Sequence, residues 1–377
     1  MYQVSETYKR FDQKNNMVNR PSWDPSLSHL KNGRHAPQLR SIERNVTGFS
    51  LKDFAFACAS SVSATSLGTN INRPDSGLTS WKPRPVYASF KFPEERPRVS
   101  DAAMATAQVK RVARYFGADL VGIAGLDRRW VYSHHYAPET GESRPVEIGE
   151  NYKYVIAMGM EMDYRMLRTA PSPVHMAETL LTYSRMAFLV SAVAEFIRNL
   201  GYSAIPALND TALNVPIAID AGLGQLGRQG LLITPSFGPR QRICKVITDL
   251  PLEADHPIDF GVTRFCSACG KCARECPSQA VWPGELTAET TCISNNSGVL
   301  KWPLAAEKCY EYWCKVGTNC GICIRTCPFN KGAGKWHNLT RWLVKHAPAV
   351  DRLLVRLDDL AGYGKYHDPE RFWEQKI

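Results

Sequence analysis

Two short stretches organise this chain: CSACGKCARECP at residues 266–277 and CGICIRTCP at residues 320–328. The first spaces its cysteines as C-x2-C-x2-C-x3-C-P, and the second is a shortened version of the same pattern. Thiolates are soft, charged ligands that bind iron well, and this spacing is typical of proteins that hold two iron–sulfur clusters. The sequence therefore predicts two [4Fe-4S] clusters and one-electron transfer.

The last cysteine of each run assigns the ligands. In two-cluster ferredoxins, the Cys that precedes Pro leaves its own loop and ligates the other cluster. One cluster then takes Cys266, Cys269, Cys272 and, from the far run, Cys327. The other takes Cys276, Cys320, Cys323 and one more thiolate, for which the candidates are Cys309, Cys314 and Cys292.

Among these candidates, Cys309 is favoured because it stands far enough before Cys320 to reach the cluster from a separate turn, and Cys314 is the next choice. Zinc is the alternative metal, since CxxC pairs also serve zinc. Two cysteine runs that both end in Cys-Pro are much rarer among zinc sites, which favours iron–sulfur clusters. Cys58 and Cys244 lie outside the runs, and we expect both to be buried small apolar residues.

The composition is that of a globular protein. The chain has 377 residues, 44% hydrophobic and 22% charged, with a formal net charge of +10. Because Lys and Arg are scattered, we expect a solvated basic surface that helps to dock an acidic electron donor, and no nucleic-acid partner. No apolar stretch of about 18 residues is present, so no transmembrane segment is predicted. The signal-like stretch at 54–67 is short, Ser-rich and far from the N-terminus, and we expect it to be folded chain.

Four regions are predicted. Residues 1–100 form an irregular, aromatic-rich wrap that contributes to a substrate pocket, to which Trp313 is also expected to contribute. Residues 101–260 alternate between helix and strand patterns, which predicts an α+β core with α/β layering. Residues 261–335 form the cluster module. Residues 336–377 form an amphipathic helix, broken near Pro348, and an aromatic tail; packing on the core is expected rather than a place on a membrane surface.

Within the core, periodicity and capping signals place the elements. Helices are predicted at 101–116, 177–200 and 214–221. Strands are predicted at 119–124, 154–160, 203–205, 230–234 and 246–248.

A Gly-rich segment, AGLGQLGRQG (221–230), has the glycine spacing of a dinucleotide-binding loop. The context differs, since the run follows a predicted helix and no acidic residue stands about twenty positions on. The same glycines could let the backbone approach another large, flat cofactor. Tyr183, Asn209, Arg240 and Arg242 lie near this segment in the sequence. Each of these four, taken alone, is typical of an ordinary helix, cap or surface residue.

Taken together, these motifs resemble the corrinoid-dependent reductive dehalogenases, and the resemblance covers nearly the whole chain. The segments that carry it are RFDQKNNMVNRPSWDP (10–25), YSRM (183–186), PALNDTALN (206–214), AGLGQLGRQG (221–230), ITPSFGPRQRICKV (233–246), both cysteine runs, KCYEYW (308–313) and GYGKYHDPE (362–370).

The resemblance implies a nitroreductase-like core that binds base-off cobalamin, with a two-[4Fe-4S] ferredoxin-like module against it. The cysteine of KCYEYW matches a cluster ligand of the family, which favours Cys309 over Cys314. Carried over by motif, Tyr183 is implied as the proton donor. Asn209 is implied to position the substrate and polarise the phenol, and Arg242 to be the basic residue beside it, with Arg240 less favoured. Cobalamin contacts are expected from Gly222, Gly224, Gly227, Arg228 and Gly230.

The implied reaction is R–X + 2 e⁻ + H⁺ → R–H + X⁻ on a small organohalide. A cation beside a phenol stabilises the phenolate and eases proton transfer to a carbanion-like product. The chain lacks the twin-arginine signal of respiratory members and the fused reductase domains of self-sufficient ones. We therefore expect a cytoplasmic protein, or else a processed exported form, served by an external low-potential donor such as a ferredoxin, a flavodoxin or a membrane anchor subunit.

Two rival functions remain at this point. Epoxyqueuosine reductase, a tRNA-modifying enzyme, has the same cofactors but usually carries Trp and Lys where this chain has Gln225 and Arg228. A non-enzymatic iron–sulfur electron carrier is the other rival.

Overall fold

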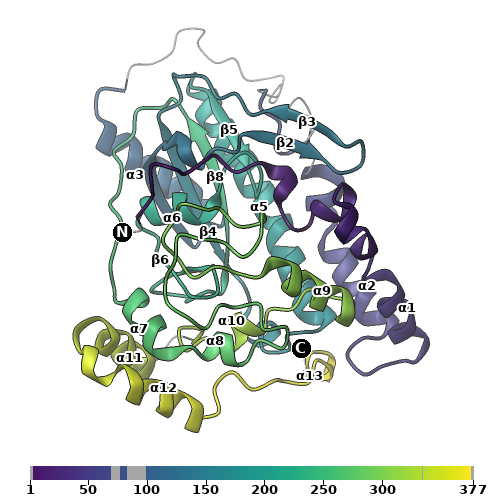
Figure 1. The fold of residues 1–377 in the computed structure, drawn as a ribbon. Coiled ribbons are helices and arrows are strands. Elements are labelled where there is room, and N and C mark those ends of the chain that lie inside the picture. Colours follow the sequence, from purple (N-terminus) through teal and green to yellow (C-terminus); the bar gives the residue numbers. More distant parts are fainter. Residues whose placement is uncertain (1–2, 69–76, 83–98, 333, 375–377) are drawn as a thin grey trace.

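The computed structural model describes residues 3–68, 77–82, 99–332 and 334–374 (Figure 1). At its centre is a four-stranded sheet in the order β1-β4-β8-β5, in which every neighbouring pair is antiparallel. The edge strand β5 contains Pro206, which is tolerated there because a proline has no N–H to give to a further strand. The strands are β1 (Leu120–Gly125), β4 (Tyr154–Glu161), β8 (Gln241–Thr248) and β5 (Ala204–Ala207).

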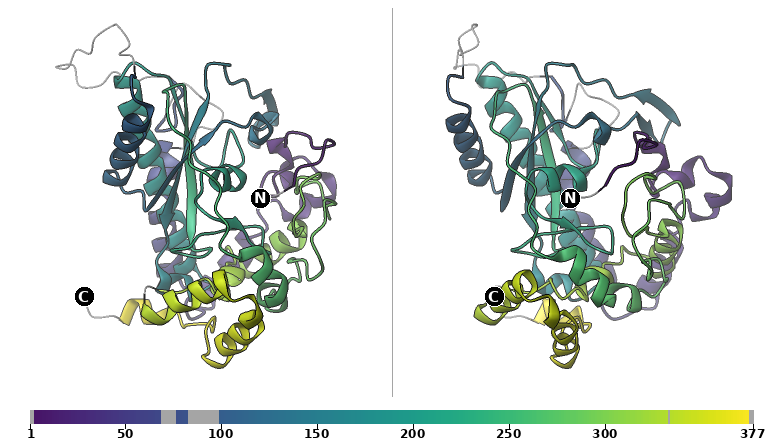
Figure 2. Two further views of the ribbon diagram at one scale, coloured as in Figure 1. Left: turned by 90° about the vertical axis from the view of Figure 1, so that its left-hand side faces the viewer. Right: turned by 60° about the vertical axis from the view of Figure 1, so that its left-hand side comes forward.

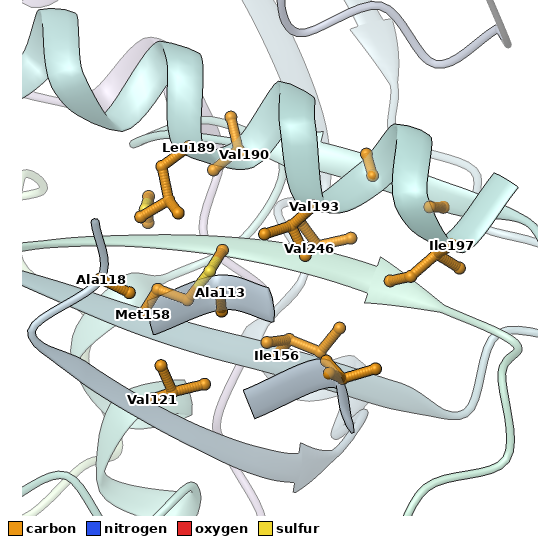
Figure 3. Close-up of a cluster of buried hydrophobic side chains, with 14 of the residues drawn as sticks. Ala113, Ala118, Val121, Ile156, Met158, Leu189, Val190, Val193, Ile197 and Val246 are labelled. Atoms are coloured by element: carbon orange, nitrogen blue, oxygen red, sulfur yellow. The ribbon is translucent and has the colours of Figure 1, made fainter. Parts of the chain in front are cut away.

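Helices cover both faces of this sheet, which explains why its strands are apolar on both sides. Helices α3 (Ala102–Tyr115) and α5 (Pro173–Asn199) lie on one face. Figure 3 shows Val190, Val193 and Ile197 of α5 pointing onto the side chains of the sheet. Helix α6 (Asn214–Asp220) packs on the other face, and Figure 2 shows the sheet between these layers.

Helix α5 is the element that links the core to the other regions. It begins where the Ser172 side chain accepts a hydrogen bond from His175 N, with Pro173 at the first helical position. By length and composition it could cross a membrane, but half of its most apolar window is buried inside the protein. Its apolar residues contact the sheet and α2 (Leu51–Ser60), so core packing accounts for its composition.

The predicted core elements are confirmed, with shifted ends. Helices α3, α5 and α6 and strands β1, β4, β5 and β8 lie where helix and strand patterns were found. The strand predicted at 230–234 shrinks to β7 (Leu232–Ile233), because it pairs only with β6 (Gln225–Leu226). A hairpin of β2 (His134–Ala137) and β3 (Glu142–Pro145) was not predicted.

The N-terminal wrap spans the core and the cluster module. Ser22 Oγ lies 2.9 Å from Tyr136 Oη of the β2–β3 hairpin, and Arg20 forms an ion pair with Glu307 of the module. Residues 54–67 are folded as expected, in α2 and η4, but Cys58 is exposed on α2 rather than buried. The other elements of the wrap are η1 (Gln13–Asn15), η2 (Arg20–Ser22), η3 (Pro25–Leu30), α1 (His35–Glu43) and η4 (Ser63–Gly68). The core also contains two short helices, η5 (Arg128–Trp130) and α4 (Tyr164–Leu167).

The C-terminal segment packs on the cluster module and also contacts the core, where Arg341 Nη2 of α11 donates to Ser236 O at 3.1 Å. Val344 and Val355 join Val262 and Phe265 in one buried cluster, because the amphipathic faces of α11 and α12 meet α7. The break near Pro348 is confirmed. The module helices are α7 (Val262–Cys269), α8 (Lys271–Arg274), α9 (Ala306–Val316) and α10 (Ile322–Arg325), followed by α11 (Lys335–His346), η6 (Pro348–Val350), α12 (Asp351–Leu360) and α13 (Glu370–Glu374).

The tail returns to the first part of the chain. Trp373 Nε1 donates to the buried carboxylate of Asp53 at 2.7 Å, and Phe372 stacks on Phe56 with ring centres 5.0 Å apart.

Candidate active site and cluster module

The cysteines of the first group gather around α7, α8 and α10. Burial and the neighbouring thiols raise the pKa of Cys266 and Cys272 to about 12. Cys327 acts on Cys272 in the same way, while Cys266 and Cys269 act on Cys327. The four thiols named for one cluster are therefore neighbours in space.

The second group consists of Cys276, Cys309, Cys320 and Cys323. Burial, reinforced by neighbouring thiols, raises the pKa of Cys309 to about 12 and that of Cys320 to about 11. Cys323 is in turn influenced by the other three thiols of the group. The structure thus brings Cys309 to this group from helix α9.

The two rejected candidates have other neighbours. Cys314 packs with Leu27 and Leu30 of the wrap, and its sulfur would lie 2.8 Å from a Cβ at Gly33. Cys292 Sγ accepts a hydrogen bond from Asn295 Nδ2 at 3.3 Å.

The two thiol groups do not form a single-ion site. Within the described residues, no three His, Cys, Asp or Glu side chains are close enough to hold a single metal ion. A zinc site gathers its sulfurs about 2.3 Å from one centre. In a four-iron cluster the four thiolates bind separate iron atoms, and two groups of four thiols provide the ligands for two such clusters.

Tyr183, Asn209 and Arg242 come together from α5, the loop after β5, and β8. Asn209 Nδ2 donates to Tyr183 Oη at 2.5 Å, and the guanidinium carbon of Arg242 lies 5.4 Å from the centre of the Tyr183 ring. Tyr183 and Arg242 are half-buried and Asn209 is exposed, so a small molecule can reach the phenol. Both neighbours stabilise negative charge on the phenol oxygen.

Arg240, the less favoured arginine, is engaged elsewhere. Its guanidinium donates to Asn330 Oδ1 at 3.0 Å and to Met162 O at 2.8 Å, and it pairs with Glu161. Arg242 Nε, by contrast, is a buried donor without a partner among the described residues. The geometry therefore places Arg242 at the phenol.

A cavity of about 380 Å³ opens beside Asn209. The core forms one wall, and residues 294–304 of the cluster module form another. Gln229 and Trp302 line it, and each has a buried donor, Nε2 and Nε1 respectively, that lacks a partner within the described chain. Because buried donors are nearly always paired, these atoms fit a bound group with acceptor oxygens.

The Gly-rich segment contributes to this cavity through Gly230, where a Cβ would meet nothing within 4 Å. Gly222 and Gly224 do not line it. A Cβ on Gly222 would lie 2.5 Å from a backbone carbonyl oxygen, and one on Gly224 would lie 2.1 Å from Ile233 O. These two glycines, and Gly227 beside Ile233, are therefore needed for packing of the chain on itself.

Arg228 was expected to contact the cofactor, but its guanidinium points into the cluster module. Its Nε donates to Cys266 O at 3.1 Å, and Nη1 donates to Trp282 O at 3.0 Å and Gly284 O at 2.8 Å. Its guanidinium carbon lies 4.7 Å from the centre of the Trp302 ring. Arg228 is buried, and it supports the cavity wall from behind.

The aromatic walls of the cavity were not foreseen. They are Trp130, Tyr132 and Trp302, whereas Trp313 lies on α9 beside Tyr310. Of the described wrap residues, Asn16 lines this cavity; residues 69–76 and 83–98 of the predicted wrap lie outside the described residues. A second cavity of about 220 Å³, between α11, α12 and Phe265, has none of the predicted catalytic residues in its lining.

Comparisons with known proteins agree on one family. Residues 140–252 match the model of a reductive dehalogenase subunit, and residues 265–330 match that of a 4Fe-4S double cluster binding domain. A tetrachloroethene reductive dehalogenase of Sulfurospirillum multivorans is 39% identical over 317 residues, covering 78% of this chain and 63% of the relative. Another, of Dehalobacter restrictus, is 37% identical and covers 71% of this chain and 55% of the relative. The chain thus spans somewhat more than half of these curated relatives.

A solved catabolic reductive dehalogenase, NpRdhA, has the same fold. It superposes on 98% of this chain and 48% of its own with a TM-score of 0.75 at 24% identity. An epoxyqueuosine reductase of Lactococcus garvieae is 34% identical, but over 33% of this chain.

Proposed function

The chain carries the reductive dehalogenase subunit domain and belongs to that family, and we propose that it removes a halogen from a small organohalide: R–X + 2 e⁻ + H⁺ → R–H + X⁻. The observation that carries the proposal is the hydrogen bond from Asn209 to Tyr183 under the guanidinium of Arg242. Asn209 also lines the cavity of about 380 Å³, so it would connect the phenol to whatever is bound there.

The cofactor we propose for the cavity is a corrinoid, by analogy with another solved reductive dehalogenase, 23% identical with a TM-score of 0.73, whose description refers to B12-dependent dehalogenation. Gln229 Nε2 and Trp302 Nε1 would donate to its amide oxygens, and Gly230 would let it approach the backbone. When bound and reduced, a corrinoid supplies the electrons that cleave the carbon–halogen bond.

The protein's own part is to orient the substrate and to hold the proton. Arg242 and Asn209 would stabilise the Tyr183 oxygen as its proton leaves for the product carbon. Arg242 also offers a positive charge to the departing halide. Trp130, Tyr132 and Trp302 would give the bound groups aromatic neighbours.

Electrons would enter from an external low-potential donor through the two clusters. The start of α5 lies against the second cysteine group, because a Cβ at Gly321 would be 2.4 Å from His175 Nε2. Tyr183 follows His175 by eight residues on the same helix, a rise of about 12 Å. Cluster and phenol are therefore joined by one rigid element.

The test is halide release by the cluster- and corrinoid-loaded protein with a reduced donor and a panel of chlorinated and brominated substrates. Tyr183→Phe should keep iron and corrinoid content and lose about 100-fold or more in rate. Full activity of this variant would refute the proton-donor role. Turnover of epoxyqueuosine without any halide release would refute the whole proposal.

A further inference from the structure

A buried lysine lies behind the candidate active site. Lys245 projects from the middle of β8 with no exposed surface, and its Nζ donates to Leu208 O at 3.0 Å, Asp210 O at 2.9 Å and Asn214 Oδ1 at 2.7 Å. Burial lowers its pKa to about 8, so at neutral pH it is still mainly an ammonium group. An ammonium presents donors and no acceptor.

The ammonium group of Lys245 fixes the orientation of two side-chain amides, first that of Asn214 and then that of Asn209. Because Lys245 can only donate, the Asn214 atom that faces it must be the oxygen. The other Asn214 atom is then Nδ2, which lies 2.9 Å from both Leu208 O and Ile243 O, two further acceptors. Asn209 Oδ1 is a third acceptor at 2.9 Å, so one of the two hydrogens of Nδ2 is shared between two acceptors.

Asn209 is thereby left with one orientation. Its oxygen faces Asn214, so its Nδ2 must point to Tyr183 Oη, where the distance is 2.5 Å. We propose that Lys245 and Asn214 are positioning residues that fix the amide of Asn209 so that the Tyr183 oxygen accepts a hydrogen bond and directs its own proton away from the protein. This inference rests on the proposed role of Tyr183 as proton donor.

Other charged or titratable groups near the phenol do not set this direction. Arg242 lies over the face of the ring rather than in line with the oxygen. Tyr132 donates to the backbone oxygen of Asn209 at 3.0 Å, and Asp210 and His135 interact electrostatically with Lys245 or Tyr132. The described contact that reaches the phenol oxygen is that of Asn209.

The test reverses the hydrogen-bond direction along the chain from Lys245 through Asn214 and Asn209 to Tyr183, which we call the relay. In Asn214→Asp, oxygen replaces the donor, so Asn209 is expected to turn its Nδ2 toward Asp and its oxygen toward Tyr183, which then donates its proton to Asn209. We expect kcat to fall about 10- to 100-fold, with KM changed less than about 3-fold, because a bond to a developing charge is lost. Asn214→Leu removes the link without inverting it and should give a smaller loss. Lys110→Met removes an amine bonded to Asp255 outside the relay and is the matched control.

The second readout needs no turnover. The infrared C–O stretch of a tyrosine differs between a phenol that accepts a hydrogen bond and one that only donates one. The band of Tyr183 is obtained with ring-labelled tyrosine, as the difference between the spectra of the wild type and Tyr183→Phe. It should change to the donor type in Asn214→Asp. A folded Asn214→Asp or Asn214→Leu protein with the wild-type stretch and kcat would overturn the relay, even if Tyr183→Phe is inactive. If Tyr183→Phe is active, the proposed function itself fails.

Discussion

Replacing Arg228 by Met should release the corrinoid without changing any residue that lines the cavity. The guanidinium makes three hydrogen bonds to carbonyl oxygens of the cluster module and packs on Trp302. Each bond from a charged donor contributes about 1.5–3 kcal/mol. Because the variant also removes the cost of burying a cation, we expect a net loss of about 3 kcal/mol. If that energy holds the cavity wall in place, the affinity for corrinoid falls about 100-fold.

The assay is corrinoid bound per protein in a titration of the cluster-loaded, corrinoid-free protein, with iron measured on the same samples. Arg264→Met is the matched control, since Arg264 is also an arginine of the module region and pairs with Asp351 away from the cavity. It should weaken the packing of α12 and leave corrinoid affinity unchanged. Equal corrinoid affinity in wild type and Arg228→Met, at equal iron content, would show that Arg228 does not support the wall.

Three further outcomes are expected. Cys309→Ser should lose about half of the iron, whereas Cys314→Ser should keep it all; equal iron in both would contradict the assignment of the second group. Met158→Ala removes a fully buried side chain beneath α5 and should lower the free energy of unfolding by about 2–5 kcal/mol, measured with denaturant. Burial lowers the pKa of Lys301 to about 8, so the unfolded chain binds more protons than the folded one between pH 8 and 10.5. Its contribution to stability therefore rises with pH across that window, and the rise should be smaller in Lys301→Met; identical slopes would refute the burial effect.

Local patterns were enough to find the core elements. Asp101 caps α3 by accepting from Met104 N, and Gly117 follows the helix with a φ of 104°, as the sequence indicated. The break at Pro348 was likewise predicted from a local signal, the proline itself. The partners of α11 and α12 could not be predicted from local signals, because an amphipathic face indicates that a helix packs on something but does not identify the partner.

Part of the candidate site could also be predicted from the sequence, and part could not. Cysteine spacing named seven of the eight cluster ligands, and motif resemblance favoured Cys309 as the eighth. Motif resemblance also named Tyr183, Asn209 and Arg242, which do meet. Of the glycines named for cofactor contact, Gly230 lines the cavity, whereas Gly222, Gly224 and Gly227 are close to atoms of the chain itself. Lys245 could have been found from the sequence, because it is a lone lysine inside the apolar run ICKVIT, where an unpaired charge would be costly.

The contact between Trp373 and Asp53 has a consequence for how the protein is made. Asp53 is completely buried, and its partners come from Ser50 beside it and from Trp373 of α13. During synthesis the wrap is made before α13, so this part of the wrap reaches its final packing only after α13 has been translated. Until then the carboxylate of Asp53 lacks its partner from α13.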